Sequence, residues 1–157
     1  PVGYITQTTL SLWDTEKIVT ALKKRFPLLS GPSKADICYA TQNRQNAVVA
    51  LAQQSEIIII CGSPSSSNSK RLLETAKAQN VESYMIENAN EFDFSLLRDK
   101  STVGVSSGAS VPSFIVEEVV AKIEELYPGS ETIRSESLEG EIKFQLPREL
   151  KQLELTP

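Results

Sequence analysis

The chain reads EIIIIC from Glu56 to Cys61, and this stretch decides the fold class. Four consecutive isoleucines are typical of a strand that is buried on both faces, as the strands of parallel sheets are. A polar loop (62–68) follows the strand, and the apolar spacing after the loop predicts a helix over residues 69–79. The stretch therefore predicts a strand–loop–helix unit of an α/β domain.

The same order of elements recurs on both sides of this unit. Other strands are expected at 2–6, 81–86, 102–105 and 141–146, and other helices at 15–26 with Asp14 as cap, at 42–54 with Thr41 as cap, at 90–98 and through 116–127. The alternation predicts an α/β fold of repeated strand–loop–helix lobes with mainly parallel sheets. We divide the chain into the C-terminal part of a truncated lobe (1–30), a complete lobe (31–128) and a tail with a terminal strand (129–157).

Composition narrows the possible function classes. The 157 residues carry a formal net charge of −4 and include no histidine, which excludes a Ser-His-Asp triad, a Cys–His pair and a His-ligated metal within the chain. The acidic balance argues against a nucleic-acid surface, because such surfaces need clustered Lys and Arg. The longest apolar run is far shorter than the roughly 18 residues that a membrane span requires. An ordinary globular domain is therefore the expectation.

Three polar loops are expected at the carboxyl ends of strands, at 6–9, 62–69 and 106–110. Ligands of open α/β sheets bind at these ends, and helix N-termini that follow such loops hold phosphates through free N–H groups. The alternative is that their Ser, Asn and Gly residues simply make turns and caps. Three such loops in one small domain favour a small anion, which we expect to be a phosphate ester or a diphosphate.

The two cysteines have different expected places. Cys61 ends the buried isoleucine strand, where a cysteine is usually inert packing. Cys38 lies just before an expected helix, and composition alone favours a structural role for it as well. Two cysteines without histidine complete neither a zinc site nor an ordinary iron–sulfur site. If Cys38 is a metal ligand, its fellow ligands therefore lie outside this chain, and reduced thiols are the default expectation.

Four segments together carry a resemblance to a known family. They are TQTTLS at 6–11, DICYATQNRQ at 36–45, SSNS at 66–69 and GAS at 108–110. In this order they closely resemble the C-terminal half of the LytB/IspH family of 4-hydroxy-3-methylbut-2-enyl diphosphate reductases. The likeness covers essentially the whole chain from Gly3 onward.

The resemblance implies a three-lobed α/β enzyme with a 4Fe-4S-type iron–sulfur cluster at its centre. Such an enzyme removes the allylic hydroxyl of its substrate reductively and gives isopentenyl and dimethylallyl diphosphates, the last step of the non-mevalonate isoprenoid pathway. Cys38 matches one cluster ligand, and Thr8 matches the threonine near the substrate hydroxyl. The residues that match the family's diphosphate-holding residues are Ser66, Ser67, Asn68 and Ser110.

Some parts of the family's site have no counterpart here. The other two cluster cysteines, the diphosphate-contacting histidines and the catalytic glutamate belong to the family's N-terminal half. We therefore expect no catalytic residue in this chain, which opens without Met and is expected to be the C-terminal portion of a longer protein, inactive alone. Ser65 stands where Asn is common, and 106–107 reads Ser-Ser where Thr-Ala is usual.

The resemblance also implies partners and a location. We expect a small allylic diphosphate as substrate, an electron donor such as ferredoxin or flavodoxin, and neither a nucleic-acid nor a membrane partner. The expected location is the bacterial cytoplasm, or a plastid in a eukaryote. Two alternatives stay open: a non-catalytic phosphate- or diphosphate-binding α/β module similar to sugar-phosphate isomerase domains, and a structural α/β segment without a site.

Overall fold

The computed structural model describes residues 1–32 and 37–134. Its elements, in chain order, are α1 (Leu12–Arg25), α2 (Tyr39–Ala52), β1 (Ile57–Cys61), α3 (Ser67–Ala78), β2 (Glu82–Ile86), the short 3-10 helices η1 (Ala89–Glu91) and η2 (Phe94–Leu97), β3 (Val103–Ser107) and α4 (Ser113–Leu126). No helix of the described ranges is both long enough and apolar enough to cross a membrane.

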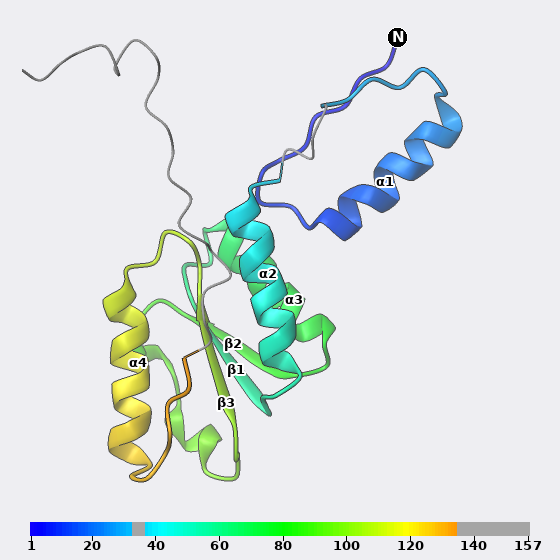
Figure 1. Ribbon diagram of the computed structural model, residues 1–157. Coiled ribbons are helices and arrows are strands. Elements are labelled where there is room, and N and C mark those ends of the chain that lie inside the picture. The colour runs from blue at the N-terminus through cyan, green and yellow to red at the C-terminus, as the bar shows by residue number, and fades with distance from the viewer. Residues whose placement is uncertain (33–36, 135–157) are drawn as a thin grey trace, which may run out of the picture.

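The three strands form one parallel sheet in the order β2-β1-β3. Cys61 at the end of β1 pairs with Ile86 on one side and with Ser107 on the other, so the three carboxyl ends share one edge. Helices α2 and α3 cover one face of the sheet and α4 covers the other (Figure 1). The prediction of an α/β fold with a parallel sheet is confirmed.

The core explains why β1 needs four isoleucines. All four are fully buried, and they alternate between the two faces of the sheet. Ile57 and Ile59 belong to the cluster that includes Val119 of α4, whereas Ile58 and Ile60 belong to the cluster made with α2 and α3. Each buried isoleucine contributes roughly 1.5–3 kcal/mol relative to an exposed one. Helices on both faces are therefore a direct consequence of the EIIIIC stretch.

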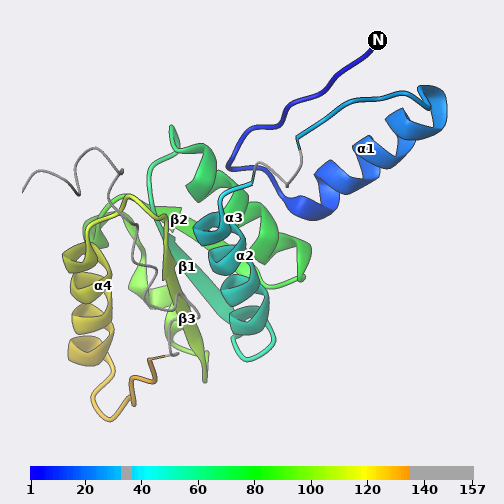
Figure 2. The ribbon, with the colours of Figure 1, turned by 45° about the horizontal axis from the view of Figure 1, so that its top comes forward.

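Residues 1–32 form an arm that extends from the sheet unit and contains α1 (Figure 2). The strand expected at 2–6 is present only as a parallel bridge between Gly3 and Ser30. None of the α1 side chains is buried among the described residues. Trp13 and Ile18 are 57% and 62% exposed, so the arm leaves apolar surface open.

Several predicted element ends are wrong. Helix α1 begins at Leu12 because Ser11, not Asp14, is its N-cap, and the Ser11 hydroxyl accepts a hydrogen bond from the Asp14 N–H. Helix α2 begins at Tyr39 with Cys38, not Thr41, at the N-cap position. The helix expected at 90–98 is instead the pair η1 and η2.

Two further ends lie elsewhere than expected. Helix α3 begins at Ser67, two residues early, because Ser66 caps it. Strand β3 continues to Ser107 because Ser106 and Ser107 still pair with β1. Asp36 of the family segment, the strand expected at 141–146 and most of the expected tail at 129–157 lie outside the described residues.

The full burial of β1 predicts that truncating one of its isoleucines lowers the free energy of unfolding. Ile58→Ala deletes a fully buried side chain between β1 and the α2–α3 layer, and should lower the free energy of unfolding by about 2–5 kcal/mol. Ile5→Ala is the matched control, because Ile5 is 89% exposed and its truncation should change stability by no more than about 0.5 kcal/mol. Urea unfolding of both variants measures the difference, and equal losses would contradict the assignment of the core.

Candidate functional site

Two polar loops meet at the carboxyl edge of the sheet. One follows β1 and leads into α3, and the other follows β3 and leads into α4. The first residue of each loop is a glycine that still bonds to the sheet: the Gly62 N–H donates to the Ile86 carbonyl at 2.8 Å, and the Gly108 N–H donates to the Cys61 carbonyl at 3.0 Å. Both loops are therefore anchored where they leave the strands.

Serines organise the loop after β1. The hydroxyls of Ser63 and Ser65 are 2.9 Å apart, and the Ser65 N–H also donates to the Ser63 hydroxyl. The Ser66 hydroxyl accepts from the Ser69 N–H at 3.3 Å and so caps α3. The turn-and-cap interpretation thus accounts for part of the serine content of this loop, but it does not account for the next residue that is predicted to bind, Asn68.

Asn68 has a polar group that nothing among the described residues satisfies. Its Oδ1 and Nδ2 atoms are both buried and have no hydrogen-bond partner in this part of the chain. The Nδ2 atom is 3.7 Å from the point where a Cβ on Gly108 would lie, so the amide is at the junction of the two loops. A buried unpaired polar group costs about 1–3 kcal/mol, and such groups call for a water or a ligand. The Asn68 amide therefore leaves hydrogen-bonding capacity at the junction that the described residues do not use.

The other predicted residues of these loops lie nearby. Ser66, Ser67 and Asn68 are consecutive at the start of α3, and Ser67 is exposed. Ser110 is exposed and follows Gly108 by two positions. The first turns of α3 and α4 open toward the same edge, and helix N-termini favour anions through their unpaired N–H groups and the helix dipole. The arrangement suits a small anion held by neutral donors.

Thr8 and Cys38 are brought into direct contact. The Cys38 N–H donates to the Thr8 carbonyl at 3.0 Å, although the two residues come from different segments. Cys38 is exposed at the N-cap position of α2, so its thiol is accessible. Cys61 is fully buried, and burial raises the pKa of its thiol to about 11, which keeps it protonated at neutral pH. Of the two cysteines, Cys38 is thus the one suited to bind a metal.

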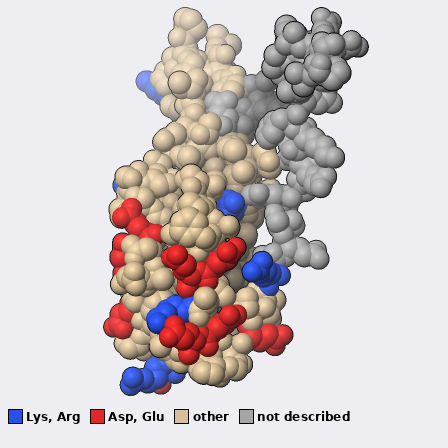
Figure 3. Space-filling model, turned by 90° about the vertical axis from the view of Figure 1, so that its left-hand side faces the viewer, with Lys and Arg blue, Asp and Glu red and all other residues tan. Residues whose placement is uncertain are grey.

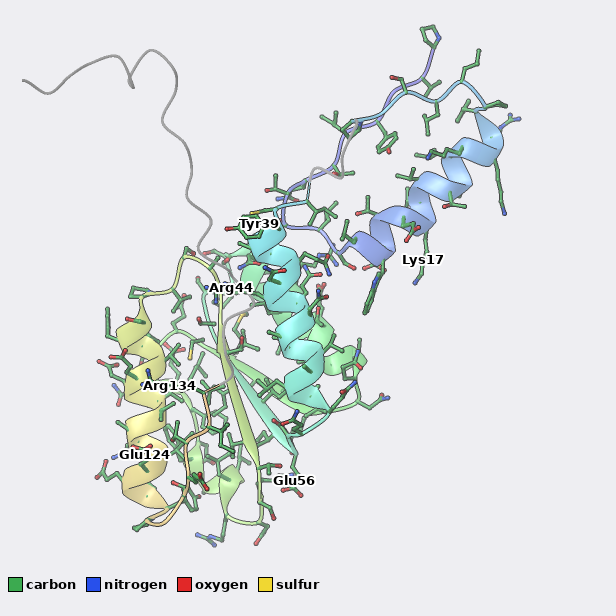
Figure 4. The ribbon with its side chains drawn as sticks, in the orientation of Figure 1. Lys17, Tyr39, Arg44, Glu56, Glu124 and Arg134 are labelled. Atoms are coloured by element: carbon green, nitrogen blue, oxygen red, sulfur yellow. The ribbon has the colours of Figure 1, made fainter. Side chains whose placement is uncertain are left out.

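Helix α2 connects this pair to the two loops. The Arg44 guanidinium donates through Nη1 to the Ser107 carbonyl at 3.2 Å, at the last residue of β3. Figure 4 shows Tyr39 and Arg44 on the half of α2 that lies at this edge of the sheet. Arg44 is not among the site residues predicted from the sequence. The available signal is that Arg44 is the only charged residue between Asp36 and Glu56.

The described residues do not supply a complete metal site. Within them no group of three or more Cys, Asp or Glu side chains could hold a metal ion. Acidic side chains gather instead on the half of the surface that holds α4 (Figure 3), where Glu117, Glu118, Glu124 and Glu125 are exposed as expected for a solvated helix face. The site therefore offers one thiol, Cys38, and a set of uncharged anion donors.

The comparisons with known proteins identify the family. Residues 1–124 match the family model described as LytB protein. The chain is 46% identical over 149 residues to a 4-hydroxy-3-methylbut-2-enyl diphosphate reductase of Dechloromonas aromatica, with 95% of this chain and 48% of the relative covered. It is 45% identical over 150 residues to the enzyme of the same name from an Escherichia coli strain, with 96% and 47% covered.

Solved structures agree with these relatives. The structure of the E-1-hydroxy-2-methyl-but-2-enyl-4-diphosphate reductase from Plasmodium falciparum superposes with a TM-score of 0.81 at 31% identity, over 95% of this chain and 47% of that one. A second structure, of (E)-4-hydroxy-3-methyl-but-2-enyl diphosphate reductase, gives a TM-score of 0.56 at 34% identity, over 79% and 43%. The chain spans about half the length of the curated relatives it matches. By its sequence and its fold, this chain belongs to the LytB family.

Proposed function

We propose that this chain supplies the diphosphate-binding loops and one cluster ligand of a 4-hydroxy-3-methylbut-2-enyl diphosphate reductase. The relatives bear that name, and the proposed reaction is the reductive removal of the substrate's allylic hydroxyl to give isopentenyl and dimethylallyl diphosphates. One observation carries the proposal: the Asn68 amide is buried and unpaired among the described residues, at the junction of two loops that match the family's diphosphate loops.

The loops supply donors that suit a diphosphate. The Asn68 amide donates through Nδ2, and the exposed hydroxyls of Ser67 and Ser110 donate from either loop. Ser66 can serve both the protein and the ligand, because capping uses a lone pair of its oxygen and leaves its O–H proton free to donate to a phosphate. Hydrogen bonds to a charged acceptor are about twice as strong as neutral ones, so neutral donors suffice to orient the anion.

Cys38 would hold the iron–sulfur cluster, of 4Fe-4S type by resemblance to the family. Its exposed thiol, fixed at the α2 N-cap by the backbone bond to Thr8, fits a single ligand position. The remaining ligands lie outside this chain, because it has no third cysteine and no histidine. When bound, the cluster would pass on electrons from an external donor and would offer a Lewis-acidic iron for the departure of the hydroxyl as water.

Thr8 would orient the reacting end of the substrate. Its carbonyl holds the Cys38 N–H, and the residue is exposed, so its hydroxyl is available to the substrate's hydroxyl beside the cluster ligand. The chain's own part in the reaction is thus to bind and orient. Two protons and two electrons enter as the C–O bond breaks, and the acid that gives a proton, a glutamate by resemblance, lies outside these residues. An electron donor such as ferredoxin or flavodoxin completes the proposal.

A non-catalytic diphosphate-binding module is the second candidate. The observation that favours it is that the described residues provide anion donors but no group of three possible metal ligands. The two candidates differ in what Cys38 does, and the two predictions below separate them.

Asn68→Ala tests the anion site. It removes the unpaired amide and should weaken binding of inorganic pyrophosphate to this chain by roughly ten- to a hundredfold, as the loss of a hydrogen bond to a charged group does. Its melting temperature without ligand should stay the same or rise. Asn46→Ala, on the exposed side of α2, is the control and should leave affinity unchanged. Titration calorimetry gives the affinities, and equal affinities for both variants would contradict the site.

Cys38→Ser and Cys61→Ser test the cluster ligand. In the complete polypeptide that contains these 157 residues, Cys38→Ser should abolish the visible absorbance and iron content of the cluster and lower turnover at least a hundredfold. Cys61→Ser places a hydroxyl in the core, so it should lower stability and leave the iron content unchanged. Both variants should still bind pyrophosphate. Full iron content in Cys38→Ser would contradict the ligand role of Cys38, whereas a complete polypeptide that holds no iron before any substitution would favour the non-catalytic module.

A further inference from the structure

We propose that Ser69 is a positioning residue of this site: its side chain sets the spacing between the loops after β1 and β3, and thereby places Asn68 against Ser110. The inference rests on the proposed function, because the two loops are those assigned to the diphosphate. Ser69 itself faces the protein interior and reaches the ligand only through its neighbours.

Stability alone does not explain a serine at this position. Ser69 is fully buried, and its hydroxyl has no hydrogen-bond partner within the described ranges. Its backbone N–H is used by the Ser66 cap, but that bond would form with any residue. A buried unpaired hydroxyl destabilises a fold relative to an alanine of similar size. The presence of a hydroxyl at this position must therefore be explained by its contacts with neighbouring residues.

Ser69 Oγ touches both loop glycines. A Cβ on Gly62 would lie 2.2 Å from this oxygen, and a Cβ on Gly108 would lie 2.5 Å from it. Neither glycine has a positive φ, so close approach, and not backbone conformation, requires glycine at both positions. The oxygen therefore fills the space between the sheet-anchored residues that begin the two loops.

The contact between Ser69 and Gly108 lies between two of the proposed ligand donors, Asn68 and Ser110. Asn68 precedes Ser69 in the same turn of α3, and Ser110 follows Gly108 by two positions. Any change in the separation of Ser69 and Gly108 moves these two donors relative to each other. Displacements of about half an ångström are enough to impair a site built from several convergent donors. A small residue at position 69 is thus a condition for the spacing of the site.

The structure supplies a sharp test in a double substitution. In Gly108→Ala the new Cβ meets Ser69 Oγ, and its next neighbours, Val111 Cγ2 at 3.5 Å and Asn68 Nδ2 at 3.7 Å, are at ordinary contact distance. Ser69→Ala removes the one close atom and should relieve the clash. In Gly62→Ala the new Cβ also meets the Ser69 Cβ at 2.6 Å, which Ser69→Ala retains. Gly62→Ala is therefore a matched control that the same second substitution cannot rescue.

The readout is the affinity of this chain for inorganic pyrophosphate, measured well below every melting temperature. Gly108→Ala should weaken binding at least tenfold, and the Gly108→Ala/Ser69→Ala pair should return to within about threefold of Ser69→Ala alone. Gly62→Ala should stay weak with or without Ser69→Ala. Ser69→Ala alone should weaken binding about three- to tenfold, while its melting temperature without ligand should be unchanged or higher. A purely structural role of Ser69 would not produce weaker binding together with undiminished stability.

The outcomes separate this inference from the function on which it rests. Pyrophosphate binding by the unsubstituted chain, weakened by Asn68→Ala but without rescue of Gly108→Ala, overturns the role of Ser69 and leaves the site standing. Rescue of melting temperature without rescue of affinity has the same meaning. No binding by the unsubstituted, folded chain overturns the proposed site and this inference together.

Discussion

The burial of β1 on both faces is the constraint on which the rest of the structure depends. Four isoleucines without exposed surface require a layer on each side, and a parallel neighbour on each edge satisfies their backbone groups. Parallel pairing then brings the ends of β1 and β3 to one edge, and the following helices start there with unpaired N–H groups. The position of the proposed anion site thus follows from how the core is built.

The proposed site, unlike the core, contains features that lower the stability of the fold. Around Asn68 and Ser69 the protein retains buried polar atoms without partners among the described residues, and it keeps glycine at positions 62 and 108, where a Cβ would collide with the Ser69 hydroxyl. Each of these features lowers the free energy of unfolding. The core, which is covered by helices on both faces of the sheet, contributes enough stability for the fold to tolerate them. The same residues are the ones that bring two loops together, so the local loss of stability and the proposed binding role have one physical origin.

The sequence predicts what depends on periodicity and on local chemistry, and much less of what depends on contacts between distant segments. The isoleucine run predicts a strand buried on both faces, and the alternation of strands with helices predicts the parallel sheet and the edge at which its loops lie. Helix starts were less predictable, because Ser11 and Asp14 are both good caps and only the fold decides between them. The role proposed for Ser69 is not predicted from the sequence, because its neighbours Gly62 and Gly108 come from two different loops. The family segment SSNS includes Ser69, but the resemblance assigns a role only to the three residues before it.

The two halves of the proposed site depend on different parts of the molecule. The two proposed diphosphate loops are fixed within the sheet unit, by the backbone bonds of Gly62 and Gly108 to the strands and by the Ser69 contact between the loops. Cys38 is placed at the start of α2, and its N–H bond to Thr8 ties it to the arm of residues 1–32, in which α1 buries no side chain among the described residues. A weakly packed arm cannot hold a ligand position as firmly as a sheet does. The proposed anion half of the site is thus set by the sheet unit, whereas the proposed cluster half also depends on how firmly the arm is held.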